Sequence, residues 1–126
     1  MFEIPIQPLS QNLAWGSGRR YKSKKYHEYE TAIKAYLKKL HLPSIKHKDP
    51  FYLYLEFGIP YMQDCTNGVK IFEDLVANYL GINDRDMMAI YVRKVKCKKP
   101  DCFIRFAIVK NEYDLIKIIN NEEVRL

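Results

Sequence analysis

The sequence predicts a single α+β domain built on a mixed β-sheet. Its 126 residues suit one domain and are too few for two ordinary ones. Hydrophobic residues make up 48% of the chain, which is enough to form a core. Apolar residues recur in some segments at the strand period of two and in others at the helix period of about 3.6. In chain order, these segments predict β-α-β-α-β-β-α, with one domain spanning residues 1–126.

The first predicted elements are a short strand and a helix, separated by a basic loop. Residues 2–6 alternate weakly in hydrophobicity before Pro8, which predicts a strand. A polar and basic loop is expected over residues 8–25. A helix is then predicted over residues 23–40, ending before Pro43. Its apolar stripe consists of Tyr26, Tyr29, Ile33, Tyr36, Leu37 and Leu40.

The middle of the chain predicts a second strand and a second helix. Residues 51–57 alternate between purely apolar side chains and side chains with a polar tip, which predicts a half-buried strand. A helix is predicted over residues 66–80. Thr66 is the expected N-cap of this helix, and Gly81 stands just past its end, where helices often finish on glycine.

The last part of the chain predicts an acidic turn, a β-hairpin and a terminal helix. The turn covers residues 83–86. Residues 87–97 and 102–109 are predicted strands joined by a Lys-Lys-Pro-Asp turn, so they are expected to pair with each other. Residues 112–119 have apolar residues at helical spacing and predict a short helix.

The charge balance favours a polyanionic partner. The chain has 21 Lys and Arg against 15 Asp and Glu, which gives a net charge of +6. A small basic domain often binds nucleic acid. A solvated basic surface that serves only solubility is the alternative interpretation.

The remaining composition favours a cytoplasmic protein without a membrane partner. No run approaches the roughly 20 apolar residues needed to span a bilayer. The N-terminus lacks the basic and apolar segments of a secretory signal. Three cysteines, an odd number, indicate free thiols in a reducing compartment. A zinc site is not expected, because all three histidines lie within residues 27–47, far from the cysteines.

Polar and acidic residues gather around the second predicted helix. Asn67, Lys70 and Asp74 recur at i, i+3 and i+7 and form a polar stripe opposite the apolar one. Asp64 comes just before the helix, and Asp84 follows the loop that leaves it. If the next strand lies beside the start of the helix, these carboxylates converge.

The chemistry of these residues suits a metal-dependent nuclease. Clustered carboxylates without His or Cys bind hard cations such as Mg²⁺ or Mn²⁺. Such an ion activates water and offsets the charge that builds on a phosphodiester, and a nearby lysine stabilises the same charge. Asp64, Asp84 and Lys70 form such a set. Each also has a structural interpretation: favourable charge near a helix N-terminus for Asp64, an i, i+4 pair for Lys70 and Asp74, and a common turn pair for Asn83-Asp84.

Two groups of motifs follow each other along nearly the whole chain. The first is Pro8-Leu9-Ser10-Gln11-Asn12, then Gly18-Arg19-Arg20-Tyr21-Lys22-Ser23 before the first helix. The second is Asp64-Cys65-Thr66-Asn67, then Lys70, Asp74 and Asn83-Asp84. In order and spacing, these motifs resemble those of the RusA family of crossover junction endodeoxyribonucleases.

The resemblance implies a homodimeric, Mg²⁺-dependent endonuclease that resolves four-way (Holliday) junctions in DNA by paired symmetric nicks, with Mn²⁺ able to substitute. It implies that Asp64 and Asp84 are metal ligands and that Lys70 is the catalytic lysine. It also implies that Asn67 supports the start of the helix.

The chain departs from the family at two positions of the implied site. Thr66 stands where the family usually has its second motif Asp, and Asn83 replaces the first member of the Asp-Asp pair. The loss of a charged ligand at position 66 is expected to weaken metal binding. Asp74 and Asp86 are the nearest spare carboxylates and are expected to compensate as metal ligands.

The basic residues predict where DNA binds. With Asn67, the main DNA-binding tract is expected to consist of Arg19, Arg20, Lys22, Lys24 and Lys25. A second tract consists of Arg93, Lys94, Lys96, Lys98 and Lys99. Two other functions stay open: a RusA-like protein that binds branched DNA but cuts it slowly or not at all, and a basic RNA-binding protein.

Overall fold

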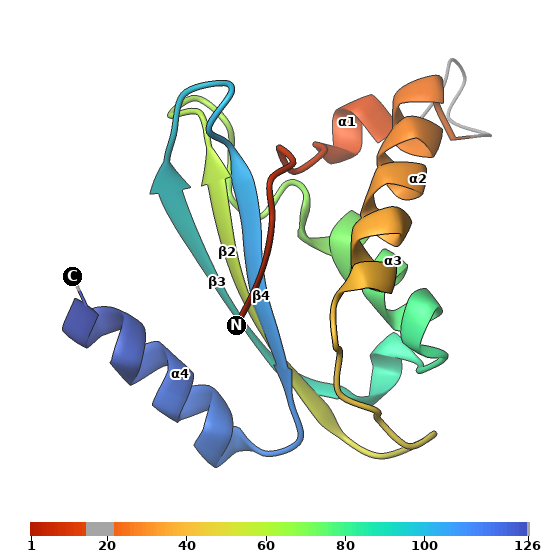
Figure 1. The fold of residues 1–126 in the computed structure, drawn as a ribbon, viewed down its shortest axis with the longest axis vertical. Coiled ribbons are helices and arrows are strands. Elements are labelled where there is room, and N and C mark those ends of the chain that lie inside the picture. Colours follow the sequence, from red (N-terminus) through yellow and green to blue (C-terminus); the bar gives the residue numbers. More distant parts are fainter. Residues whose placement is uncertain (15–21, 126) are drawn as a thin grey trace.

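A mixed, open sheet of four strands forms the centre of the domain (Figure 1). The computed structural model describes residues 1–14 and 22–125, and the side chains as far as residue 121. The spatial order of the strands is β1-β4-β2-β3, with β2 parallel to β3 and antiparallel to β4. Their bounds are β1 (Phe2–Ile4), β2 (Phe51–Ile59), β3 (Met87–Lys96) and β4 (Phe103–Val109).

The predicted hairpin between the last two strands is wrong. β3 and β4 follow each other in the chain, but β2 lies between them and pairs with both. The reason is burial: all but one of the residues of β2 are buried, so this strand belongs in the middle of the sheet. β3 carries Arg93, Lys94 and Lys96, and charged side chains are tolerated on an outer strand.

Three helices cover one face of the sheet: α1 (Gln11–Ala14), α2 (Lys24–Lys39) and α3 (Val69–Leu80) (Figure 1). The short α1 lies within the segment that was expected to be a loop. Ser23 caps α2 by accepting a hydrogen bond from the backbone N–H of Tyr26 at 3.1 Å. The predicted α2 stripe is confirmed, because Tyr26, Tyr29, Ile33 and Leu37 are buried in the main core.

A single helix, α4 (Glu112–Arg125), covers part of the opposite face (Figure 1). It is longer than the predicted 112–119. Its Leu115 packs with Tyr54 of β2 and Ala107 of β4 in a second, smaller core. Tyr54 is fully buried as a result, so the expectation of a half-buried β2 is wrong. No helix in the described part of the chain has the length and apolar character that crossing a membrane requires.

A buried carboxylate lies on the same face of the sheet as α4. Glu56 of β2 is only 2% exposed. It accepts hydrogen bonds from the Tyr54 hydroxyl at 2.8 Å and from the Arg105 guanidinium. Arg105 also reaches the exposed Glu3 of β1, with 2.8 Å between Nη2 and Oε1. Arg105 of β4 thereby links to β2 through a buried carboxylate and to β1 through an exposed one.

The start of α3 differs from the prediction, while its end agrees with it. Thr66 does not cap the helix, because residues 65–68 form a turn and α3 begins after Gly68, which provides no side-chain cap. Gly68 allows the Leu9 carbonyl to come so close that an added Cβ would lie 2.7 Å from its oxygen. At the other end, Gly81 adopts the left-handed conformation with φ of 70° and ends the helix as expected.

Candidate metal centre

α3 and the turn that follows it bring three carboxylates together. Glu73 and Asp74 are neighbours on α3, and Asp84 begins a short 3₁₀ helix, Asp84–Asp86. One oxygen from each carboxylate lies within 4.8 Å of the other two. The left-handed Gly81 reverses the chain after α3, which brings Asp84 back alongside the helix. We call Glu73, Asp74 and Asp84 the carboxylate cluster.

Lys70 holds the carboxylate cluster together. Its ammonium group donates a hydrogen bond to Oδ2 of Asp84. The same Nζ lies 3.1 Å from Oδ1 of Asp74 and 3.9 Å from Oε1 of Glu73. One lysine therefore neutralises part of the charge of three carboxylates, from a position one helical turn before two of them.

The charges of the cluster shift its pKa values in opposite directions. The hydrogen bonds to Asp84 and then to Asp74 raise the pKa of Lys70. The hydrogen bond from Lys70 lowers the pKa of Asp84 below its ordinary value. Burial raises the pKa of Glu73, although the charge of Lys70 partly opposes this. Lys70 and Asp84 therefore form a charged pair at neutral pH, with Glu73 behind them in a drier environment.

The cluster could hold a metal ion. Its ligand atoms are carboxylate oxygens, which hard divalent cations prefer. Glu73 is 8% exposed and makes no hydrogen bond to a described residue, so its negative charge is not fully satisfied by the protein. Lys70 and a bound cation would contact the same oxygens.

The structure brings together some of the predicted residues and separates the others. Asp74, Asp84 and Lys70 lie in or against the cluster. Among the described residues, Asp64 and Asp86 are not part of this cluster, so their expected roles as metal ligands stay predictions. Asp86 has a buried Oδ2 atom without a hydrogen-bond partner in the described part of the chain.

Asp64 lines a cavity that is separate from the carboxylate cluster. This cavity, about 440 Å³ in volume, is also lined by Asn67 and Lys25. The backbone carbonyl of Asn67 accepts a hydrogen bond from the N–H of Gln11 at 3.0 Å, which attaches α1 to the start of α3. Asp64 belongs to the turn before α3, whereas Lys70 and the cluster lie further along the helix.

Glu73 was not among the predicted site residues. It directly follows Phe72 of the apolar stripe, and the structure shows that its side chain is buried. A signal was present, because Glu73 is three residues after Lys70 and residues at i and i+3 are neighbours on a helix.

The predicted DNA-binding lysines are partly engaged with the protein. Arg19 and Arg20 lie outside the described residues. Nζ of Lys22 lies 4.1 Å from the centre of the Tyr26 ring, and Nζ of Lys24 lies 4.0 Å from the Glu28 carboxylate. Lys25 is exposed and lines the same cavity as Asp64.

The second basic tract lies at the end of β3 and in the loop after it. Lys94 donates hydrogen bonds to the Tyr61 carbonyl at 2.7 Å and the Gln63 carbonyl at 2.6 Å, so it fixes the loop after β2. Lys96 lies 4.8 Å from the centre of the exposed Tyr61 ring. Lys98 and Lys99 are exposed. Lys96, Lys98 and Lys99 thus form the more accessible part of this tract.

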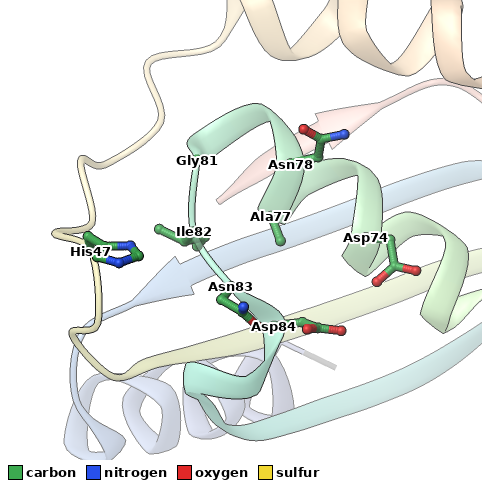
Figure 2. A pocket seen from close by; sticks show the side chains of 8 residues that line it. All are labelled: His47, Asp74, Ala77, Asn78, Gly81, Ile82, Asn83 and Asp84. Carbon is green, nitrogen blue, oxygen red and sulfur yellow. The ribbon is translucent and has the colours of Figure 1, made fainter.

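A further cavity, of about 430 Å³, opens beside the carboxylate cluster (Figure 2). Asp74 and Asp84 line it, together with Asn78, Asn83 and His47. The side-chain Oδ1 of Asn83 accepts a hydrogen bond from the backbone N–H of Arg85 at 2.9 Å, which fixes the start of the 3₁₀ helix.

Comparison of the sequence with protein-family models gave no matching family, and comparison with curated proteins gave no matching relative.

Proposed function

We propose that the protein is a Mg²⁺-dependent endonuclease that acts on branched DNA, in the manner of the RusA-like Holliday junction resolvases. The observation that carries the proposal is the carboxylate cluster of Glu73, Asp74 and Asp84 with Lys70 against it. Carboxylate oxygens can hold a divalent cation that activates water, and a lysine beside them can stabilise the charge that develops during phosphodiester hydrolysis.

Each residue of the site has a distinct part in this proposal. Asp74 and Asp84, which are accessible at the surface, would hold the cation with Glu73 behind them. The bound Mg²⁺ would supply an activated water and neutralise negative charge. Lys70 would turn from the carboxylates toward the phosphate, where its ammonium stabilises the charge of the reacting group. Mn²⁺ would substitute because it prefers the same oxygen ligands.

We also propose that the protein binds DNA as a homodimer in the cytoplasm. Lys22, Lys24, Lys25, Lys96, Lys98 and Lys99 would contact phosphates, which supply affinity without reading sequence. A two-fold symmetric homodimer would present two identical sites to the two equivalent strands of a four-way junction. The three cysteines are free thiols, which supports a reducing, cytoplasmic location.

One observation favours a second candidate, a protein that binds branched DNA without cutting it. Lys70 already contacts all three carboxylates of the cluster, and an ammonium group held there competes with a divalent cation. Thr66, in place of an acidic residue, adds no charge that would favour the cation.

The deciding experiment is an assay of nicking on a labelled four-way junction, with a linear duplex as the comparison substrate. It would be run with Mg²⁺, with Mn²⁺ and with EDTA. Asp84→Asn tests the cluster. Glu112→Gln is the matched control for loss of one negative charge. Glu112 is exposed on α4, which lies on the opposite face of the sheet from the cluster.

We expect paired symmetric nicks that need the metal, are lost in Asp84→Asn and persist in Glu112→Gln. Tight junction binding without nicks in either metal would reject the endonuclease and favour the binding protein. Equal affinity for junction, duplex and RNA would reject both.

A further inference from the structure

The 430 Å³ cavity beside the carboxylate cluster has two chemically different ends (Figure 2). The carboxylates of Asp74 and Asp84 lie at one end, on α3 and the 3₁₀ helix. His47 faces the cavity from the other side, on the linker between α2 and β2. The volume of the cavity falls within the range of about 300–1,000 Å³ that is usual for ligand sites.

The linker holds His47 in place through a tight turn. Ile45, just before it, is 8% exposed and packs in the main core. The N–H of Asp49 donates a hydrogen bond to the Lys46 carbonyl at 3.0 Å and closes the turn. Lys48 has a φ of 71°, in the left-handed region. His47 therefore lies at the tip of a turn that is anchored to the core.

The His47 end of the cavity offers hydrogen-bond donors that the protein does not use. Within the part of the chain that the structure describes, the side chains of His47 and Asn78 make no hydrogen bond or ion pair. Asn83 engages its carbonyl oxygen with Arg85, which leaves its NH₂ group as a donor. Lys46 and Lys48, which flank His47, are both exposed.

This arrangement matches a nucleic-acid strand better than an isolated anion. The carboxylate end repels a phosphate unless a cation lies between them, whereas the His47 end attracts one. A strand carries phosphates at regular intervals, so one phosphate can meet the cation while its neighbour meets the donors. Ala77 and Gly81 also line the cavity, and neither has a bulky side chain that would keep a nucleoside away.

We propose that this cavity is a strand-binding subsite, in which His47 donates a hydrogen bond to the phosphate next to the one that is cleaved. The inference rests on the proposed function and deepens it, because it adds a binding residue from a segment far from the cluster in sequence. Asn78 and Asn83 would contact the nucleoside between the two phosphates.

The test compares His47→Ala with His41→Ala, since His41 is exposed in the same linker and does not line the cavity. We expect His47→Ala to raise the KM for the junction about tenfold, the loss expected for one hydrogen bond to a charged group, with kcat nearly unchanged. His47→Arg should restore the KM, and Mn²⁺ affinity should be equal in all three variants. An unchanged KM in His47→Ala would overturn the inference while leaving the endonuclease intact.

A second measurement separates failure of the subsite from failure of the proposed function. If the wild-type protein makes no nicks, the thymidine dinucleotide pTpT is titrated with Mg²⁺ present, and the imidazole NMR signals of His47 and His41 are followed. A saturable shift confined to His47, with weaker binding to His47→Ala, would support the subsite in a non-cleaving protein. No shift of His47, or equal shifts of both histidines, would overturn it.

Discussion

The ammonium group of Lys70 donates a hydrogen bond to Asp84, which lies 14 residues further along the chain. This contact joins α3 to the segment that leads into β3. It also places a protein cation where a metal ion would contact the same carboxylates. Lys70 and a divalent cation would therefore compete for the same carboxylates, and this competition sets how tightly the site binds a metal ion.

Replacing Lys70 with methionine should strengthen binding of Mn²⁺ and abolish nicking. Methionine has a similar length without the charge, so the three carboxylates lose their competing cation. We expect the dissociation constant for Mn²⁺, measured by calorimetry, to fall about tenfold, or about 1.4 kcal/mol. Lys34→Met, which removes an exposed ion pair with Glu30 on α2, is the control. Unchanged or weaker Mn²⁺ binding by Lys70→Met would show that the lysine does not compete with the cation.

Asp84 and Asp64 should differ sharply in their contribution to metal binding. Asp84 belongs to the cluster, and Asp64 lies at the separate cavity near Lys25. We expect Asp84→Asn to weaken Mn²⁺ binding by at least about tenfold, because a ligand charge is lost. Asp64→Asn should leave it within about twofold of the wild-type value. The reverse ranking, in the same calorimetric titration, would mean that the cation binds at the start of α3.

Glu73 should make the stability of the protein depend on pH. Because burial raises its pKa, the folded state binds this proton more tightly than the unfolded chain does. Ionisation of Glu73 therefore lowers the free energy of unfolding as the pH rises through its folded pKa. Glu73→Gln should therefore raise this free energy at neutral pH, because it removes the cost of ionising a buried carboxyl. The gain should disappear as the pH falls through the folded pKa, where the wild-type side chain is also neutral.

Urea unfolding of both proteins at neutral and acidic pH measures this effect. Added Mg²⁺ should stabilise the wild-type protein more than Glu73→Gln, since a bound cation favours the ionised carboxylate. A Glu73→Gln variant that is less stable at neutral pH would show that attraction to Lys70 outweighs the cost of burial.

The ion pair between Arg105 and Glu56 should matter for stability. Arg105→Met leaves the Glu56 carboxylate, 2% exposed, without its cation. We expect the free energy of unfolding to fall by about 3–5 kcal/mol. Glu3→Gln, which alters the exposed end of the same network, should change it by less than about 1 kcal/mol. Adding Glu56→Gln to Arg105→Met should recover part of the loss, and no recovery would contradict the account based on an unpaired buried charge.

Much of the fold follows from local patterns in the sequence, whereas the sheet order does not. The stripe of α2 and the glycine that ends α3 are set by neighbouring residues, and both were predicted correctly. The position of β2 between β3 and β4 depends on contacts between distant strands, and the short turn at residues 98–101 favoured the wrong pairing.

The candidate site was predicted in part for the same reason. Helical spacing associated Lys70 with Asp74, and the motif resemblance added Asp84, which lies in the turn after the same helix. Asp64 was expected to join them because it precedes the same helix. The structure instead places Asp64 at a cavity that it shares with Leu9 of the N-terminal segment, a neighbour that is distant in the sequence.

The short span between Lys70 and Asp84 also has a consequence for how the chain folds. Closing the cluster joins residues 14 apart, whereas the contact between Glu3 and Arg105 that ties β1 to the sheet joins residues 102 apart. For a flexible chain, this difference in loop length corresponds to about 2 kcal/mol of conformational entropy. The segment that carries the carboxylates is therefore expected to become ordered before the N-terminal strand docks.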